Sequence, residues 1–232
     1  MPKRFSAWIA LAILLPGAMA ALVSAHSLYS EYGPIPSLTG APAIGGSDPE
    51  FDCTLCHQDF ARPCGPDPCN LNTPGGGVEI LDMPADYVPG IAVPLRVRLW
   101  SDSTLSAPGH DWGFQITAVR EEDGAGAGTW ILPDPDTLEI VQGLPPFESR
   151  SYLEHTILGA RDGLAGSVEW AFSWMPPNGN QGKVIFCVGA AACNDNEEPG
   201  AGDFVYTVRE TLTVTPVPVI RASWGALKSK YR

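Results

Sequence analysis

Val168-Glu169-Trp170-Ala171-Phe172-Ser173-Trp174 alternates large apolar residues with small or charged ones. Successive side chains of a β-strand point to opposite faces, so this segment would place Val168 and three aromatic rings on one face. The segment Val93-Pro94-Leu95-Arg96-Val97-Arg98-Leu99-Trp100 shows the same alternation. Both segments are therefore predicted to be strands with one buried face.

The alternation recurs along the chain beyond residue 77. Turn clusters rich in glycine and proline, such as those at 123–126 and 176–179, separate the alternating segments, and no amphipathic helix lies between them. Further strands are predicted at 113–119, 137–142, 151–158, 183–188 and 204–214. About seven to nine short strands at this spacing predict an all-β fold, an antiparallel immunoglobulin-like β-sandwich, over residues 78–214.

Residues 1–25 are predicted to be a signal peptide for export. Lys3 and Arg4 precede an apolar core, and Val23-Ser24-Ala25 provides the small residues of a cleavage site. No other apolar run approaches the roughly 18 residues needed to cross a bilayer, so no transmembrane segment is expected in the mature chain. The mature protein is expected in the periplasm, at the cell surface or outside the cell.

The chain is acidic, with 14 Lys and Arg against 26 Asp and Glu and a net charge of −12. The signal peptide removes two positive residues and no negative ones, so the mature chain carries −14. A surface of this charge repels nucleic acid and anionic membranes. It either favours a cationic partner, such as a redox protein with a basic surface, or simply keeps an exported protein soluble.

Residues 26–77 are predicted to form an irregular N-terminal arm and a haem-binding segment, with only a short helical turn at 53–60. The segment contains Cys53-Thr54-Leu55-Cys56-His57. This spacing lets two thiols bond to neighbouring vinyl groups of a haem while the adjacent histidine binds the iron. One covalent haem c is therefore expected at Cys53 and Cys56, with His57 as the proximal ligand.

A haem iron has a sixth position, for which His155 is the first choice because a strand would hold it on rigid backbone. His110 is the alternative distal ligand, since Asp111 beside it is able to orient the imidazole. Three further donors are available: Met83, Met175 and His26. The default interpretation of the two methionines is that they pack in the core.

The other four cysteines form two close pairs in the sequence. Cys64 and Cys69 bracket Gly-Pro-Asp-Pro, and Cys187 and Cys193 bracket Val-Gly-Ala-Ala-Ala. An exported chain meets an oxidising compartment, so each pair is predicted to close a short loop as a disulfide. A zinc site that combines the first pair with the two cysteines of the haem motif is an open alternative. The carboxylates at 195–203 resemble hard-cation ligands but lack the spacing of a known calcium loop.

Residues 215–232 are predicted to be a separate C-terminal tail for sorting or anchoring. Pro216-Val217-Pro218 forms an extended spacer, and an apolar face follows beside the basic patch of Lys228, Lys230 and Arg232. Such a face is too short to span a bilayer but suits recognition by sorting machinery or weak binding at the envelope surface.

Together these features resemble bacterial secreted proteins with a reelin-like (reeler) β-sandwich preceded by a Cys-x-x-Cys-His motif, known as choice-of-anchor proteins. The matching positions, in order, are Gly40-Ala41-Pro42, Cys53-x-x-Cys56-His57, Gly75-Gly76, Tyr87-x-Pro89-Gly90, Gly113-Phe114-x-x-Thr117-Ala118, Glu154-His155-Thr156, Trp170-x-Phe172-x-Trp174-x-x-Pro177, Gly182-x-Val184-x-Phe186 and Asn194. The resemblance implies a reelin-like fold with an exported haem or metal site. Cys64, Cys69, Cys187 and Cys193 depart from its pattern.

The expected function is that of an exported monohaem c-type cytochrome domain, for electron transfer or redox sensing at the cell envelope. Hydrolase, dinucleotide and zinc-protease motifs are absent from the sequence, which favours an electron carrier or binding module over an enzyme. One alternative is a secreted adhesion or surface-interaction β-sandwich with structural disulfides and no haem. Another is a zinc-bearing domain that uses Cys53, Cys56, Cys64 and Cys69.

Overall fold

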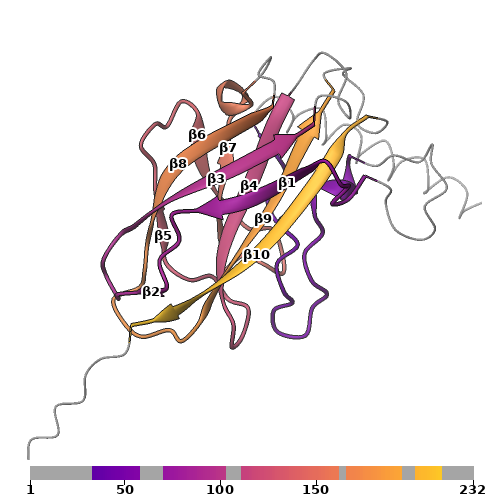
Figure 1. Ribbon diagram of the computed structural model, residues 1–232. Coiled ribbons are helices and arrows are strands. Elements are labelled where there is room, and N and C mark those ends of the chain that lie inside the picture. Colours follow the sequence, from indigo (N-terminus) through magenta and orange to yellow (C-terminus); the bar gives the residue numbers. More distant parts are fainter. Residues whose placement is uncertain (1–32, 58–69, 103–110, 162–165, 195–201, 216–232) are drawn as a thin grey trace, which may run out of the picture.

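Two β-sheets face each other in the computed structural model, which describes residues 33–57, 70–102, 111–161, 166–194 and 202–215 (Figure 1). The smaller sheet consists, in spatial order, of β1 (Gly76–Leu81), β3 (Val93–Ser101), β8 (Ser167–Met175) and β5 (Thr129–Ile131). The larger consists of β2 (Asp86–Tyr87), β10 (Phe204–Val214), β9 (Val184–Cys193), β4 (Asp111–Arg120), β7 (Ser151–His155) and β6 (Leu138–Gln142). The helices in these ranges are the 3₁₀ turns η1 (Cys53–Leu55) and η2 (Ile157–Gly159).

The pairing of the strands confirms the predicted antiparallel β-sandwich. Each paired strand in the described ranges runs antiparallel to its neighbour, apart from the short parallel pair of β2 and β10. The sequence pattern did not indicate β2 or β5 because each is only two or three residues long. No helix in the described part of the chain combines the length and the apolar character needed to cross a membrane.

The core lies between the two sheets and is built from the alternating residues that the sequence indicates. Trp170 and Trp174 of β8 are fully buried. The ring of Trp170 lies 4.6 Å from that of Phe114 in β4, and the ring of Trp174 lies 4.9 Å from that of Phe186 in β9. Both indole N–H groups donate to backbone carbonyl oxygens, so the polar atoms of these large side chains are satisfied.

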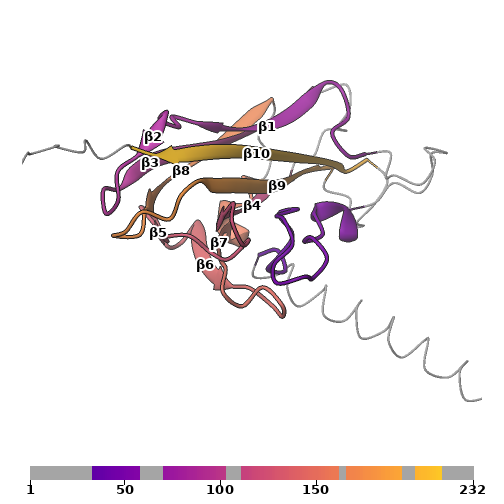
Figure 2. The ribbon, with the colours of Figure 1, turned by 90° about the horizontal axis from the view of Figure 1, so that it is seen from below.

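The N-terminal arm, residues 33–57, covers the outer face of the larger sheet (Figure 2). Even-numbered residues of β4 and β9 face the core, so the odd-numbered residues face outward. Gln115 and Cys187 lie on this outer face and are nevertheless buried. The Gln115 side chain accepts a hydrogen bond from Leu38 N (2.8 Å) and donates one to Ile35 O (3.1 Å). The arm thus forms a third layer over β4 and β9.

A buried ion pair anchors the arm to the sheet. The Arg150 and Glu50 side chains are both fully buried, with 2.5 Å between Nη1 and Oε1. Arg150 Nε also donates to Gly124 O (2.8 Å), and Thr39 Oγ1 donates to the second Glu50 oxygen (2.6 Å). Tyr152 donates its hydroxyl to Glu50, and burial together with this carboxylate raises the pKa of that phenol. The chain is therefore fixed three residues before η1.

The predicted disulfide between Cys187 and Cys193 is wrong. The segment between them continues β9, so the two residues stand six positions apart on one extended strand, about 20 Å at the usual rise. A disulfide needs Cα atoms within about 7 Å. Glycine and alanine at 189–192 are poor strand formers, but hydrogen bonds to β10 and β4 hold β9 on both edges. The described cysteines are all free thiols: Cys53, Cys56, Cys187 and Cys193.

Candidate functional site

The Cys-x-x-Cys-His motif forms a short helical turn, as the sequence predicts for this stretch. Asp52 caps the turn, since its Oδ1 accepts a hydrogen bond from Thr54 N (2.8 Å). His57 N donates to Cys53 O (2.9 Å), which closes a helical turn of four residues. Residues i, i+3 and i+4 of such a turn share one side. Cys53, Cys56 and His57 therefore lie on the same side of the turn.

This turn packs against the outer face of the larger sheet. Cys53 is buried with Ala191 of β9 and Val205 of β10, whereas Cys56 is half-buried. The close approach requires Gly189, because a Cβ there would lie 2.3 Å from Leu38 O and 3.3 Å from Cys53 Sγ. Burial raises the pKa of both motif thiols.

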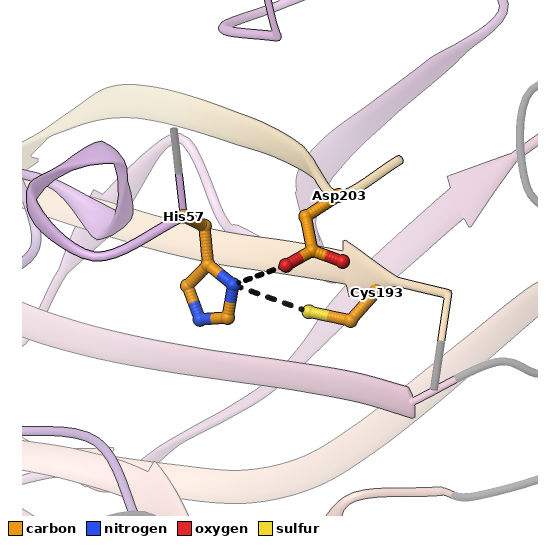
Figure 3. Close-up of side chains that lie close together, drawn as sticks. All are labelled: His57, Cys193 and Asp203. Atoms are coloured by element: carbon orange, nitrogen blue, oxygen red, sulfur yellow. Dashed lines mark hydrogen bonds and ion pairs between the residues drawn. The ribbon is translucent and has the colours of Figure 1, made fainter. Parts of the chain in front are cut away.

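The imidazole of His57 points with Nδ1 toward Asp203 and Cys193 (Figure 3). Nδ1 lies 2.7 Å from Asp203 Oδ2 and 3.6 Å from Cys193 Sγ. Burial by itself lowers the pKa of His57, but Cys193 and Asp203 more than offset this, so the pKa is well above its usual value. Among the described residues, Nε2 makes no hydrogen bond, which leaves it as the nitrogen for a further ligand.

Asp203 is itself held in place from two sides. Its Oδ1 accepts a hydrogen bond from Asn194 N (3.1 Å), and its side chain is only 3% exposed. The Asn70 amide donates to both Asp203 O (2.9 Å) and His57 O (2.7 Å). The carboxylate and the imidazole are therefore fixed in relation to each other by the backbone as well as by their direct contact.

Cys193 and Asp203 are the site residues that sequence reasoning missed. The sequence predicts a disulfide for Cys193 and a group of turn carboxylates for Asp203. Cys193 ends β9 and Asp203 immediately precedes β10. These two strands are antiparallel neighbours with Ala192 opposite Phe204, so the hairpin brings both residues together. A strand prediction that extended to residue 193 would have found the pair.

The structure places His155 at the end of β7, on the same outer face. Its ring lies over Gly113 of β4, where a Cβ would stand 2.4 Å from Cε1. Nδ1 is 3.0 Å from both the N and the O atoms of Phe114. Burial is the main cause that lowers the pKa of the His155 imidazole, and the charge of the His57 imidazole lowers it further. They make no direct contact in the described structure.

Comparison with solved structures finds reeler and cohesin domains among the similar chains. The Reelin-N domain of F-spondin is 18% identical over 61% of this chain and 87% of that chain, with a TM-score of 0.36. A human F-spondin reeler domain is 19% identical over 61% and 89%, with a TM-score of 0.35. A cohesin module from a Clostridium perfringens family 33 glycoside hydrolase is 8% identical over 62% and 98%, with a TM-score of 0.39. No family model and no curated protein sequence matches the chain. At these identities the likeness concerns the fold alone.

The other predicted ligands lie away from this face or outside the described residues. Met83 packs against the core between the sheets, and Met175 belongs to β8 of the smaller sheet. Neither methionine is on the outer face that carries His57. The signal peptide, residues 216–232 of the C-terminal tail and four predicted site residues lie outside the described ranges: His26, Cys64, Cys69 and His110.

The arrangement as a whole offers soft, borderline and hard donors on one face of the sandwich. Cys53 and Cys56 supply thiols on the turn that carries His57, and Cys193 and Asp203 supply a thiol and a carboxylate beside its Nδ1. Iron, copper and zinc accept imidazole and thiolate ligands, whereas calcium and magnesium prefer sites made of oxygen alone. The site is therefore suited to transition-metal or haem chemistry.

Proposed function

We propose that this chain is an exported monohaem c-type cytochrome domain that carries one covalent haem for electron transfer or redox sensing at the cell envelope. The observation that best supports the proposal is the orientation of His57. Its Nδ1 lies 2.7 Å from a carboxylate oxygen of Asp203, which leaves Nε2 for iron. Histidines that bind metals almost always donate their other ring N–H to a carboxylate, a carbonyl or a water in this way.

The motif also supplies the two thiols that a covalent haem needs, and the buried Cys53 side chain would turn away from Ala191 and Val205 to bond a vinyl group. Cys53 and Cys56 lie on the same side of the helical turn as His57 because of the hydrogen bond that closes it. A thioether bond from each sulfur would hold the porphyrin beside the turn, with His57 as the proximal ligand. Haem supplies one-electron redox chemistry, and the chain sets its potential through ligation, burial and hydrogen bonding.

His155 is the proposed distal ligand. Its Nδ1 is engaged by the Phe114 backbone, so Nε2 is again the nitrogen left for a metal. Burial lowers the pKa of this imidazole and keeps it neutral, which is the form that binds a metal. Both histidines therefore share the same arrangement, in which the protein holds one ring nitrogen.

Asp203 has the role of a positioning residue in this proposal. Its buried carboxylate accepts the Nδ1 hydrogen of His57 and fixes both the tautomer and the orientation of the ring. A carboxylate in that place makes an imidazole a more basic ligand, which favours ferric over ferrous iron. The net charge of −12 favours a redox partner that presents a basic surface.

An absorption spectrum and an intact mass of protein made in a host with cytochrome c maturation test this function. One haem should be added, and its Soret band should survive acid-acetone extraction. The double variant Cys53→Ala, Cys56→Ala should lose the haem, while Cys187→Ala, which removes a buried thiol away from His57, should keep it.

An unmodified mass under these conditions would overturn the haem proposal. A colourless protein whose single bound zinc is lost when Cys64 and Cys69 are replaced would then favour the zinc-bearing domain built on Cys53, Cys56, Cys64 and Cys69. A colourless, metal-free protein would favour the adhesion or surface-interaction module.

A further inference from the structure

His57, Cys193 and Asp203 bring three metal-binding side chains together from three separate segments. Their ligand atoms all lie within 4.8 Å of one another (Figure 3). They come from the turn after η1, from the last residue of β9 and from the residue before β10. We propose that these three residues bind a borderline-soft divalent metal ion such as Zn²⁺, through Nδ1 of His57, in the chain that carries no haem.

The kinds of ligand atom select the class of metal. An imidazole nitrogen, a thiolate and a carboxylate oxygen are the three protein ligand types of zinc. Calcium and magnesium would reject the sulfur, because these hard cations prefer oxygen ligands. Three protein ligands leave a fourth tetrahedral position for water or for an exogenous ligand.

The distances fit a tetrahedral ion with a small adjustment. Zinc bonds of about 2.05 Å to nitrogen and about 2.3 Å to sulfur, at the tetrahedral angle, separate the two ligand atoms by about 3.6 Å. Cys193 Sγ and His57 Nδ1 are 3.6 Å apart. The same geometry separates nitrogen and oxygen by about 3.4 Å, against the 2.7 Å observed for the hydrogen bond to Asp203 Oδ2. The nitrogen-to-oxygen separation therefore has to widen by about 0.7 Å, and the sulfur and the carboxylate already lie within 4.8 Å of each other.

The surroundings hold these ligands in advance of binding. Asn194 N donates to Asp203 Oδ1, the oxygen that does not face His57. The Asn70 side chain links the backbone carbonyls of His57 and Asp203. Hydrogen bonds of this kind orient the residues of metal sites and strengthen their affinity.

This inference does not rest on the haem proposal, because the two ligands use opposite nitrogens of one ring. Haem iron would bind Nε2, and Nδ1 would keep its hydrogen and donate it to Asp203. A metal ion at Nδ1 replaces that hydrogen, so the haem-bound and metal-bound chains are alternative states. The metal site therefore belongs to the chain before haem is attached.

Titration with Co²⁺ tests the site, in mature protein made in a host without cytochrome c maturation. One equivalent should give the visible bands of a tetrahedral ion and a near-ultraviolet thiolate charge-transfer band, both removed by Zn²⁺. Cys193→Ser should abolish the charge-transfer band and raise the dissociation constant by more than about tenfold. Cys187→Ser is the matched control, since this thiol lies on the same strand and face six residues away, and it should leave the band intact.

The identity of the coordinating nitrogen provides a second measurement that needs no substitution. Zn²⁺ should shift the ¹⁵N resonance of Nδ1 of His57 and leave Nε2 protonated. Coordination through Nε2, or a charge-transfer band that survives Cys193→Ser and disappears in Cys56→Ser, would overturn the proposal, as would the absence of stoichiometric binding. Haem attachment is measured separately by mass in a maturation host, so failure of either proposal is distinguishable from failure of the other.

Discussion

The two ring nitrogens of His57 face different surroundings, and this difference governs the chemistry of the site. Nδ1 lies between a buried carboxylate and a thiol, whereas Nε2 has no hydrogen-bond partner among the described residues. Because the contact with Asp203 fixes the ring, the same side chain suits an iron on one side and a small metal ion on the other. Whether Nε2 or Nδ1 coordinates a metal depends on whether the chain receives haem or a small metal ion.

Asp203→Asn should raise the reduction potential of the haem-loaded protein. The amide removes the negative charge beside Nδ1, so ferric iron loses more stabilisation than ferrous iron. A rise on the order of 60 mV corresponds to a tenfold change in the relative stability of the two oxidation states. Spectroelectrochemical titration measures it, with Asp48→Asn as the control, since this exposed residue undergoes the same change of charge. Equal shifts in both variants would show that Asp203 acts only through net charge.

His155→Ala should open the sixth position of the iron. The haem spectrum should change from low-spin to high-spin, and carbon monoxide should then bind to the ferrous form. His110→Ala is the informative comparison, because His110 is the alternative distal ligand. If that substitution alters the spectrum and His155→Ala does not, the distal ligand is His110.

At the level of secondary structure, the period-two alternation predicted the sandwich because side-chain burial on one face is a local signal. Trp170 and Trp174 are buried where that alternation places them. The same alternation did not predict the end of β9, because residues 189–192 are glycine and alanine and show no alternation of large apolar and polar side chains. They form a strand because β10 and β4 flank them, which is a non-local effect. The position of Cys193 beside His57 depends on that strand. The sequence alone therefore did not predict that Cys193 and Asp203 lie next to His57.

The arm depends on the ion pair of Arg150 and Glu50, so Arg150→Met should destabilise the protein strongly. The substitution leaves the Glu50 carboxylate buried without its partner, which typically costs about 3–5 kcal/mol. Urea denaturation measures the free energy of unfolding. Arg96→Met is the control, since the ion pairs of Arg96 with Asp82 and Glu169 are exposed and contribute little to stability. Similar losses in the two variants would contradict the anchoring role of Arg150.

The whole molecule is a sandwich with an acidic net charge of −12 and an arm that adds a layer to one side. The arm carries the motif, and the larger sheet supplies the partners of His57. The site therefore lies at the junction of the arm and the sandwich, and both parts are needed to form it.

Deletion of residues 216–232 should leave the fold and the haem unchanged. β10 ends at Val214, so the deleted residues follow the last strand of the sandwich. The thermal midpoint and the absorption spectrum should match those of the full mature chain, while the protein should move from the cell envelope to the medium. A truncated protein that unfolds, or that stays at the envelope, would contradict this division between tail and sandwich.

For the exported, haem-carrying chain proposed above, the anchoring of the motif by residues far along the chain would set an order of events during export. His57 meets Asp203 across 146 positions of sequence, and the strands that bury Cys53 also emerge late from the translocation channel. Throughout that interval both motif thiols would be accessible to the enzyme that attaches the proposed haem. Once β9 and β10 have paired and the arm has docked, Cys53 is enclosed. Modification of this thiol therefore has a time window, which closes when the C-terminal half of the chain has folded.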